Sequence, residues 1–200
     1  MNNESLTLFR NSSAKRTSRA FTLVELLVVV MIFSLITLLV LANNSRFNSS
    51  VLLGSLAYKI ALSIRQAQVF GVSVAPFSAS FQVGYGVHFQ QGSLSYQFFA
   101  DVNNNKHYDA GDSTVSTYSL GQGHTIKKFC GTNSSGTEFC SDTAAIDHLD
   151  IIFNRPNPDA NISSNTSSFY SSGKIVVTSP SGDTRTVTVV STGQISVTNP

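Results

Sequence analysis

The N-terminal part of the chain contains one long apolar segment, residues 21–42. Within it, the only clearly polar residues are Thr22, Glu25, Ser34 and Thr37. An α-helix rises about 1.5 Å per residue, so a helix of this length spans roughly 33 Å and crosses the hydrocarbon core of a bilayer. The pattern therefore predicts a transmembrane helix over residues 21–42.

A second helical pattern follows over residues 43–71. Its apolar residues recur every three or four positions, which predicts an amphipathic continuation of the first helix. Asn43, Asn44 and Gly54 are weak helix formers, so we expect a bend or local melting near them. Gly71 is expected to end the helix. The apolar face consists of Leu53, Ala57, Ile60, Ile64 and Ala67.

Beyond residue 71 the apolar residues alternate with polar ones, which is typical of half-buried strands. Residues 91–93 and 180–183 are expected to form hairpin turns, and the Ser- and Asn-rich residues 160–172 are expected to form a loop. A long helix packed on antiparallel strands predicts an α+β fold, with residues 72–200 as the β-rich domain. The expected strands cover residues 77–83, 87–90, 94–101, 114–120, 125–130, 149–154, 174–179, 184–190 and 194–198.

The charged residues are unevenly distributed along the chain. The segment before Phe21 carries four basic residues and one acidic residue, a net charge of +3, so the whole-chain charge of +2 leaves −1 for the remainder. Basic residues beside a membrane helix favour the cytoplasmic side, so we expect the C-terminal domain on the outer side. No strongly basic nucleic-acid-binding surface is expected.

Residues 15–26 combine basic side chains, the start of the apolar segment and Glu25. A carboxylate so near the start of a membrane helix is costly and is normally retained for a partner. This block closely resembles the class III signal of type IV prepilins and type II secretion pseudopilins, with Ala20 where that family usually has Gly. An uncleaved signal anchor and a secretory signal peptide are the alternatives, but the apolar segment is too long for the latter.

The resemblance implies a specific order of processing. A prepilin peptidase would cleave between Ala20 and Phe21, remove residues 1–20 as a leader peptide, and methylate the new amino group of Phe21. Glu25 would then engage the N-terminus of a neighbouring subunit during assembly. The implied partners are other pilin or pseudopilin subunits, the peptidase and the membrane.

The rest of the chain contains five short motifs, at residues 64–68, 85–89, 98–101, 151–153 and 193–195. In order and spacing they resemble one branch of the same superfamily, the GspH/FimT-like minor pseudopilins. The resemblance implies a pilin-like fold and a minor subunit at or near the tip of a type II secretion pseudopilus or a type IV pilus. It also implies a single-pass protein of the bacterial cytoplasmic membrane with a periplasmic or extracellular C-terminal domain.

The chain has two cysteines, Cys130 and Cys140. In an oxidising compartment they are expected to form a disulfide. Two free thiols are the alternative. A metal pair is disfavoured because no nearby Cys or His completes a tetrahedral set.

Residues 101–112 contain oxygen-bearing side chains at positions 1, 3, 5, 9 and 12, the register of a calcium-binding EF-hand loop. However, Lys106 replaces the usual Gly, and no helices flank the loop. An Asx-rich turn explains the same residues, so both readings stay open, and calcium is the one cofactor considered. The possible ligands are Asp101, Asn103, Asn105, Asp109 and Asp112.

No enzymatic site is expected from the sequence. The histidines are scattered without a metalloprotease pair, and no Gly-x-Ser-x-Gly elbow accompanies the serines. Each histidine is expected to be an ordinary surface or core residue, and the acidic residues at 142–150 to be solvated loop charges. A membrane-anchored secreted enzyme is a remote alternative. The residues concerned are His88, His107, His124, His148, Asp142, Asp147 and Asp150.

A DNA-binding minor pilin for DNA uptake is the nearer alternative, because some FimT-like pilins bind DNA through basic residues near the C-terminus. Residues 193–200 contain no basic residue, and a track for phosphates needs several clustered cations. Nucleic acid is therefore not expected as a partner. The cations considered for such a track are Lys127, Lys128, Lys174 and Arg185.

Overall fold

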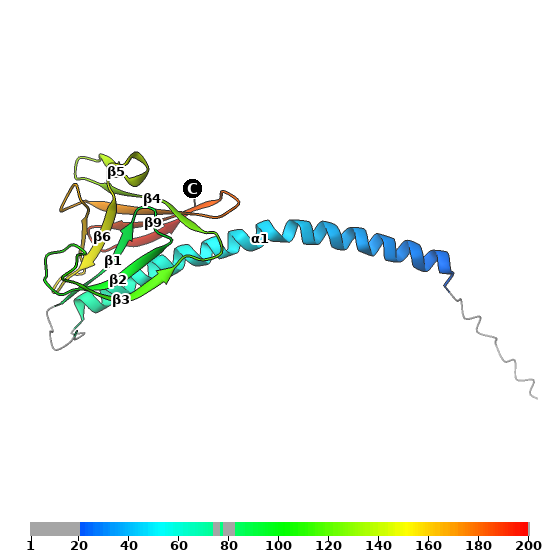
Figure 1. Ribbon diagram of the computed structural model, residues 1–200, viewed down its shortest axis with the longest axis horizontal. Coiled ribbons are helices and arrows are strands. Elements are labelled where there is room, and N and C mark those ends of the chain that lie inside the picture. The colour runs from blue at the N-terminus through cyan, green and yellow to red at the C-terminus, as the bar shows by residue number, and fades with distance from the viewer. Residues whose placement is uncertain (1–20, 74–76, 78–82, 200) are drawn as a thin grey trace, which may run out of the picture. The chain divides into compact units, whose positions relative to one another are not determined.

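The computed structural model describes residues 21–73, 77 and 83–199, with the backbone alone for residues 42–48 (Figure 1). One helix, α1, runs from Leu23 to Val72. It stays helical through Asn43, Asn44 and Gly54, so local melting at these residues is wrong, while a bend near them stays a prediction. The chain divides into two compact units between Asn43 and Asn44.

In the N-terminal unit, α1 is apolar around its whole circumference. The window Leu23–Leu41 has a mean hydropathy of 2.9, and none of it is buried. Thr22 Oγ1 accepts a hydrogen bond from the Glu25 N–H at 3.1 Å and so caps the helix start. Thr37 Oγ1 donates to the Phe33 carbonyl at 2.8 Å, which satisfies this hydroxyl within the helix. The segment is long and apolar enough to cross a membrane.

The C-terminal unit contains two five-stranded sheets in which all paired strands are antiparallel. The strand order is β3-β2-β1-β6-β7 in the first sheet and β10-β9-β8-β4-β5 in the second. With α1 they make an α+β fold, as predicted. The strands are β1 (Gly84–Gln90), β2 (Ser95–Asp101), β3 (Ser113–Ser119), β4 (Thr125–Thr132), β5 (Glu138–Cys140), β6 (His148–Phe153), β7 (Ala160–Ser163), β8 (Ser172–Thr178), β9 (Thr184–Val190) and β10 (Ile195–Thr198); a short 3-10 helix, η1 (Ser141–Thr143), follows β5.

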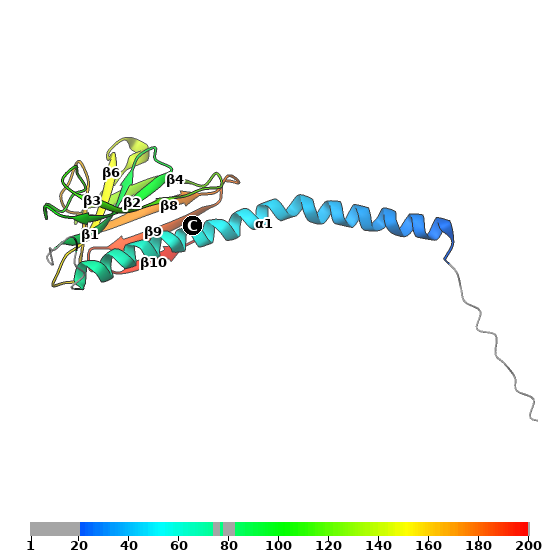
Figure 2. The same cartoon turned by 60° about the horizontal axis from the view of Figure 1, so that its bottom comes forward.

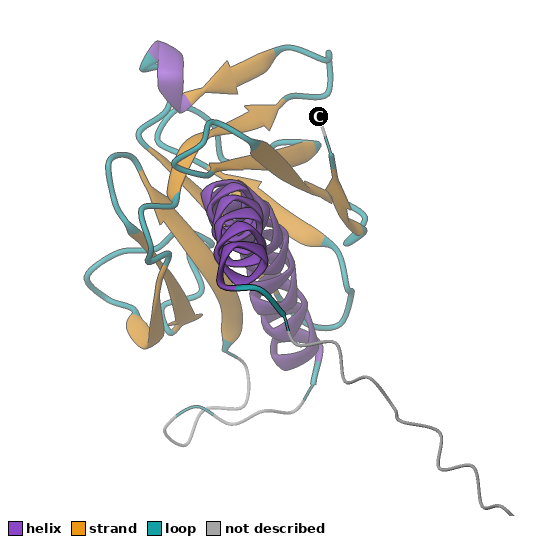
Figure 3. Ribbon diagram, turned by 90° about the vertical axis from the view of Figure 1, so that its right-hand side faces the viewer, coloured by secondary structure: helices purple, strands orange, loops and turns teal. Residues whose placement is uncertain are grey.

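The C-terminal half of α1 supplies one side of the hydrophobic core, where it lies against the strands (Figures 2 and 3). The five apolar positions that the helical period predicted are all fully buried, so this prediction is confirmed. Ser63 Oγ lies 3.0 Å from the hydroxyl of Tyr96 on β2. Gln68 Nε2 donates to the carbonyls of Pro158 and Gly193, at 2.9 and 3.0 Å. These hydrogen bonds attach the helix to β2 of the first sheet, to the β6–β7 connection and to the β9–β10 turn of the second sheet.

Two predicted features of the C-terminal unit are wrong. The stretch 160–172 was expected to be a loop, but Ala160–Ser163 form β7, because they pair with β6 and bury Ile162 completely. A tertiary pairing thus overrides the polar composition. The short strand β5 was also not predicted. The expected strand at 77–83 lies outside the described residues, except for Phe77 and Val83.

Gly71 does not end α1, because the helix continues to Val72. Its role is in packing: a Cβ atom at this position would overlap the carbonyl oxygen of Phe153 and lie 2.7 Å from the carbonyl carbon. The missing side chain therefore lets the last turn of α1 approach the end of β6.

Gly71→Ala is expected to lower the free energy of unfolding by about 1–3 kcal/mol, because the added methyl group must push the helix away from β6. Gly54 is the matched control, since a Cβ there meets nothing within 4 Å. Gly54→Ala is expected to stabilise by about 0.5–1 kcal/mol through helix propensity. Urea denaturation of the detergent-solubilised chain measures both changes. A neutral Gly71→Ala would contradict this packing.

Candidate functional site

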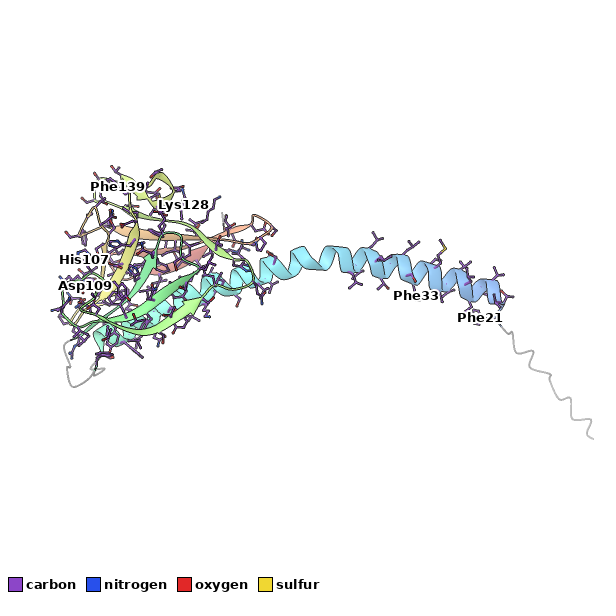
Figure 4. The ribbon with its side chains drawn as sticks, viewed as in Figure 1. Phe21, Phe33, His107, Asp109, Lys128 and Phe139 are labelled. Atoms are coloured by element: carbon purple, nitrogen blue, oxygen red, sulfur yellow. A yellow bond between two sulfur atoms is a disulfide. The ribbon has the colours of Figure 1, made fainter. Side chains whose placement is uncertain are left out.

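The N-terminal end of the described chain presents a phenylalanine and a carboxylate at the start of an exposed apolar helix. Phe21 is 77% exposed, and Figure 4 shows it at this end with Phe33 farther along the same apolar segment. Glu25 lies in the first turn of α1. No ion pair reaches its carboxylate from any residue that the structure describes. Ala20, on the other side of the predicted cleavage point, lies outside the described residues.

A comparison with protein families finds a match at this end of the chain. Residues 15–41 match the prokaryotic N-terminal methylation motif. No curated protein and no solved structure matches the chain. The methylation motif supports a type IV pilin-like precursor that prepilin peptidase processes and that assembles with other pilin subunits. Together with the apolar helix Leu23–Leu41, it indicates single-pass anchoring in the inner membrane.

Cys130 and Cys140 form a disulfide in the C-terminal unit. They face each other on the antiparallel strands β4 and β5, with their Cα atoms 4.0 Å apart. The strand pair brings together two residues that are 10 positions apart in the sequence. Closing a loop of this size stabilises a fold by about 2–3 kcal/mol in the chain-entropy model.

The carboxylates of the 101–112 loop bind backbone N–H groups of the loop itself. Asp101 accepts from the N–H of Asn105 at 3.1 Å and of Lys106 at 3.0 Å. Asp112 accepts from the N–H of Val102 and of Asp109, both at 3.0 Å. Asx-type turns, the alternative that the sequence left open beside an EF-hand, form at Asn103, Asn105 and Asp109. The side-chain oxygen of each accepts the N–H two residues further on, at 3.1, 2.9 and 2.6 Å.

The three carboxylates of this loop differ in environment. Desolvation raises the pKa of Asp101, although the backbone N–H groups that it accepts act in the opposite direction. Desolvation also raises the pKa of Asp112. Asp109 is exposed, and hydrogen bonds from the Gly111 N–H and from the amides of Asn105 and Asn103 lower its pKa. A calcium ion would have to replace several of these hydrogen bonds, and calcium binding here stays a prediction.

The 101–112 loop is also anchored to the first sheet. The Tyr108 N–H donates to Asp150 Oδ2 on β6 at 3.0 Å. Ser163 Oγ on β7 donates to the Lys106 carbonyl at 3.0 Å. These bonds hold His107 between them, and Figure 4 marks it in the same loop as Asp109.

Sequence reasoning missed a cluster around Asp150. It treated the histidines as isolated and Asp150 as a solvated charge, but Asp150 is fully buried, and His88, His107 and His148 gather around it. Only the i, i+2 spacing of His148 and Asp150, at the start of the expected strand 149–154, hinted at this arrangement. His124 lies elsewhere, with Nε2 at 3.5 Å from the Ser49 carbonyl.

Two of the cations considered for DNA binding are engaged in ion pairs. Lys128 Nζ lies 3.0 Å from Asp142 Oδ2, and Lys174 pairs with Glu138. Asp142 is thus an exposed charge on η1 with a partner, and not a loop residue as expected. Arg185 donates to the carbonyl of its neighbour Thr184 at 3.2 Å.

Proposed function

We propose that this chain is a minor pilin or pseudopilin subunit that assembles into a type II secretion pseudopilus or a type IV pilus, at or near its tip. The methylation motif over residues 15–41, joined to an apolar helix of membrane-spanning length, carries the proposal. Prepilin peptidase removes residues 1–20 and methylates Phe21. The protein then acts by assembly and not by catalytic turnover.

The proposed assembly contact joins Glu25 to the amino group of Phe21 in a neighbouring subunit. A carboxylate in an apolar helix is energetically costly unless it pairs with a cation. The N-terminal ammonium that cleavage creates is likewise costly unless it pairs with an anion. Pairing the two in the apolar centre of a filament neutralises both charges. It also sets the axial register between subunits, because the contact forms at one relative height.

A second apolar surface on α1 supports assembly through this helix. Val51, Tyr58, Leu62 and Val69 are each more than half exposed. Their spacings of seven, four and seven residues place them on one helix face, which lies opposite the buried face at 3.6 residues per turn. We call these four residues the outer apolar stripe. Exposed apolar residues aligned along one helix face are candidates for an interaction surface, and a neighbouring pilin helix is apolar enough to cover them.

The disulfide of the C-terminal unit fits a location outside the cytoplasm. A disulfide persists in the periplasm or outside the cell and is rare in the cytosol. The basic residues before Phe21 favour the same orientation. The order of short motifs that resemble GspH/FimT-like proteins supports the minor-subunit assignment over a major one.

DNA uptake has weaker support. Lys128 and Lys174 are paired with carboxylates, so their charge is already compensated. A phosphate backbone gains affinity from each cation that it meets, and two of the four cations considered for such a track are already paired. Assembly into a filament therefore accounts better for the chain.

The proposal is tested by filament incorporation. The full-length chain is expressed with a prepilin peptidase and the remaining subunits of a secretion or pilus system, and the filaments are sheared and sedimented. The chain is expected in the filament fraction only when the peptidase is active. Recovery in the membrane fraction alone, with and without the peptidase, would overturn the proposal.

A further inference from the structure

Asp150 is a fully buried carboxylate surrounded by nitrogen atoms. Its Oδ1 lies 2.6 Å from His88 Nδ1, and its Oδ2 accepts the Tyr108 N–H at 3.0 Å. Oδ2 also lies 3.9 Å from His107 Nδ1 and 3.7 Å from His148 Nε2. A buried charge is retained only when it is paired, hydrogen-bonded or bound to a metal ion.

The fold places these groups on one face of the first sheet. His88 on β1 is directly opposite Asp150 on β6 in the antiparallel register. His148 precedes Asp150 by two residues on the same strand, so both side chains point to the same side. His107 comes from the 101–112 loop, which the Tyr108–Asp150 hydrogen bond fixes over this face. Three separate segments thus converge on one point.

The hydrogen bond behind His148 prepares its other nitrogen to act as a ligand. Asp147 Oδ1 lies 2.7 Å from His148 Nδ1, so the proton is held on Nδ1 and the lone pair of Nε2 faces Asp150. A carboxylate on the distal nitrogen is the common arrangement for histidines that bind metals. The lone pair of His148 Nε2 and the negative charge of Asp150 Oδ2 then lie 3.7 Å apart. A cation between them would be attracted to both.

We propose that His107 Nδ1, His148 Nε2 and Asp150 Oδ2 bind a divalent transition-metal ion, with zinc as the first candidate and water as the fourth ligand. The three donor atoms all lie within 4.8 Å of one another. Zinc–ligand bonds of about 2.0–2.1 Å place two tetrahedral ligands about 3.3 Å apart. The distances from Asp150 Oδ2 to His107 Nδ1 and to His148 Nε2, 3.9 and 3.7 Å, would therefore each shorten by about half an ångström. Two imidazoles and a carboxylate favour zinc or copper over calcium, which prefers oxygen ligands alone.

His88 and Asp147 are positioning residues in this proposal. His88 is buried and holds the second oxygen of Asp150, while Asp147 holds His148. The water position faces solvent, because the side chains of His107 and His148 are 37% and 23% exposed. The bound ion joins the 101–112 loop to β6 and so stabilises the outer part of the domain.

Zinc binding is tested on the full-length chain in detergent, by isothermal titration with ZnCl₂ and by thermal unfolding with and without zinc. Zinc is expected to raise the melting temperature, and His107→Ala/His148→Ala is expected to weaken zinc affinity by more than about 100-fold. Asp147→Ala is expected to weaken it by about 10- to 100-fold, the usual effect of losing an outer partner. His124→Ala, which removes the histidine outside the cluster, serves as the matched control and retains full affinity.

Cobalt(II) absorbance gives a second readout that does not depend on stability, since tetrahedral coordination produces visible bands that the double variant lacks. Wild-type affinity in His107→Ala/His148→Ala, or no zinc binding by the unmodified chain, would overturn the proposal. The same titration with CaCl₂ tests the 101–112 oxygens through Asp101→Ala. A response to calcium with none to zinc would also overturn it.

Discussion

Glu25→Gln is expected to leave membrane insertion and leader removal intact and to reduce filament incorporation by about 100-fold or more. The amide keeps the size of the side chain but cannot neutralise the Phe21 ammonium of the next subunit. Removing one partner of a buried ion pair costs about 3–5 kcal/mol, because the other charge stays buried. Each 1.4 kcal/mol is about a factor of ten in an equilibrium constant.

The measurement is the ratio of the chain in sheared filaments to the chain in membranes, by quantitative immunoblot. Thr37→Val is the matched control in the same apolar segment, because the Thr37 hydroxyl already bonds to the Phe33 carbonyl and needs no partner in another subunit. Thr37→Val should assemble like the unmodified chain. Equal incorporation of Glu25→Gln would remove the proposed contact with Phe21.

Leu62→Glu is expected to weaken assembly strongly while leaving the monomer folded. Leu62 is 67% exposed, so a carboxylate is solvated there in the free subunit. In a filament the outer apolar stripe is covered, and the substitution both loses about 1.5–3 kcal/mol of leucine burial and buries an unpaired charge. The expected loss of incorporation is at least about tenfold, with a nearly unchanged melting temperature.

Leu94→Glu separates this effect from a general loss of exposed leucine. Leu94 is 63% exposed but lies just before β2, away from α1 in the sequence. It should assemble normally and melt like the unmodified chain. If both leucine variants assemble equally well, the outer apolar stripe is not an assembly surface.

The features that depend on local periodicity were predictable from the sequence. The five apolar residues from Leu53 to Ala67 recur at the helical period. They are buried because α1 presents this one face to the core. The hairpin of β8 and β9 was equally clear, since alternation and a Pro-Ser-Gly-Asp turn agree. In both cases the neighbours in space are also neighbours in sequence.

The features that depend on long-range pairing were not predictable. β7 is polar in composition and becomes a strand only because β6 offers it an edge. The Asp150 cluster needs β1, β6 and the 101–112 loop to meet, and the sequence separation of His88 and Asp150 hides their contact. The spacing of Asp101 to Asp112 left both a calcium loop and an Asx-rich turn open, because the directions of the N–H groups that these carboxylates accept depend on the folded backbone.

Processing at the Ala20–Phe21 bond is measured by the intact mass of the protein. The full-length chain is purified from membranes of cells with and without an active prepilin peptidase. We predict that the peptidase removes residues 1–20 and adds the mass of one methyl group to the new N-terminal Phe21. An unprocessed chain of identical mass in both cell types would contradict it.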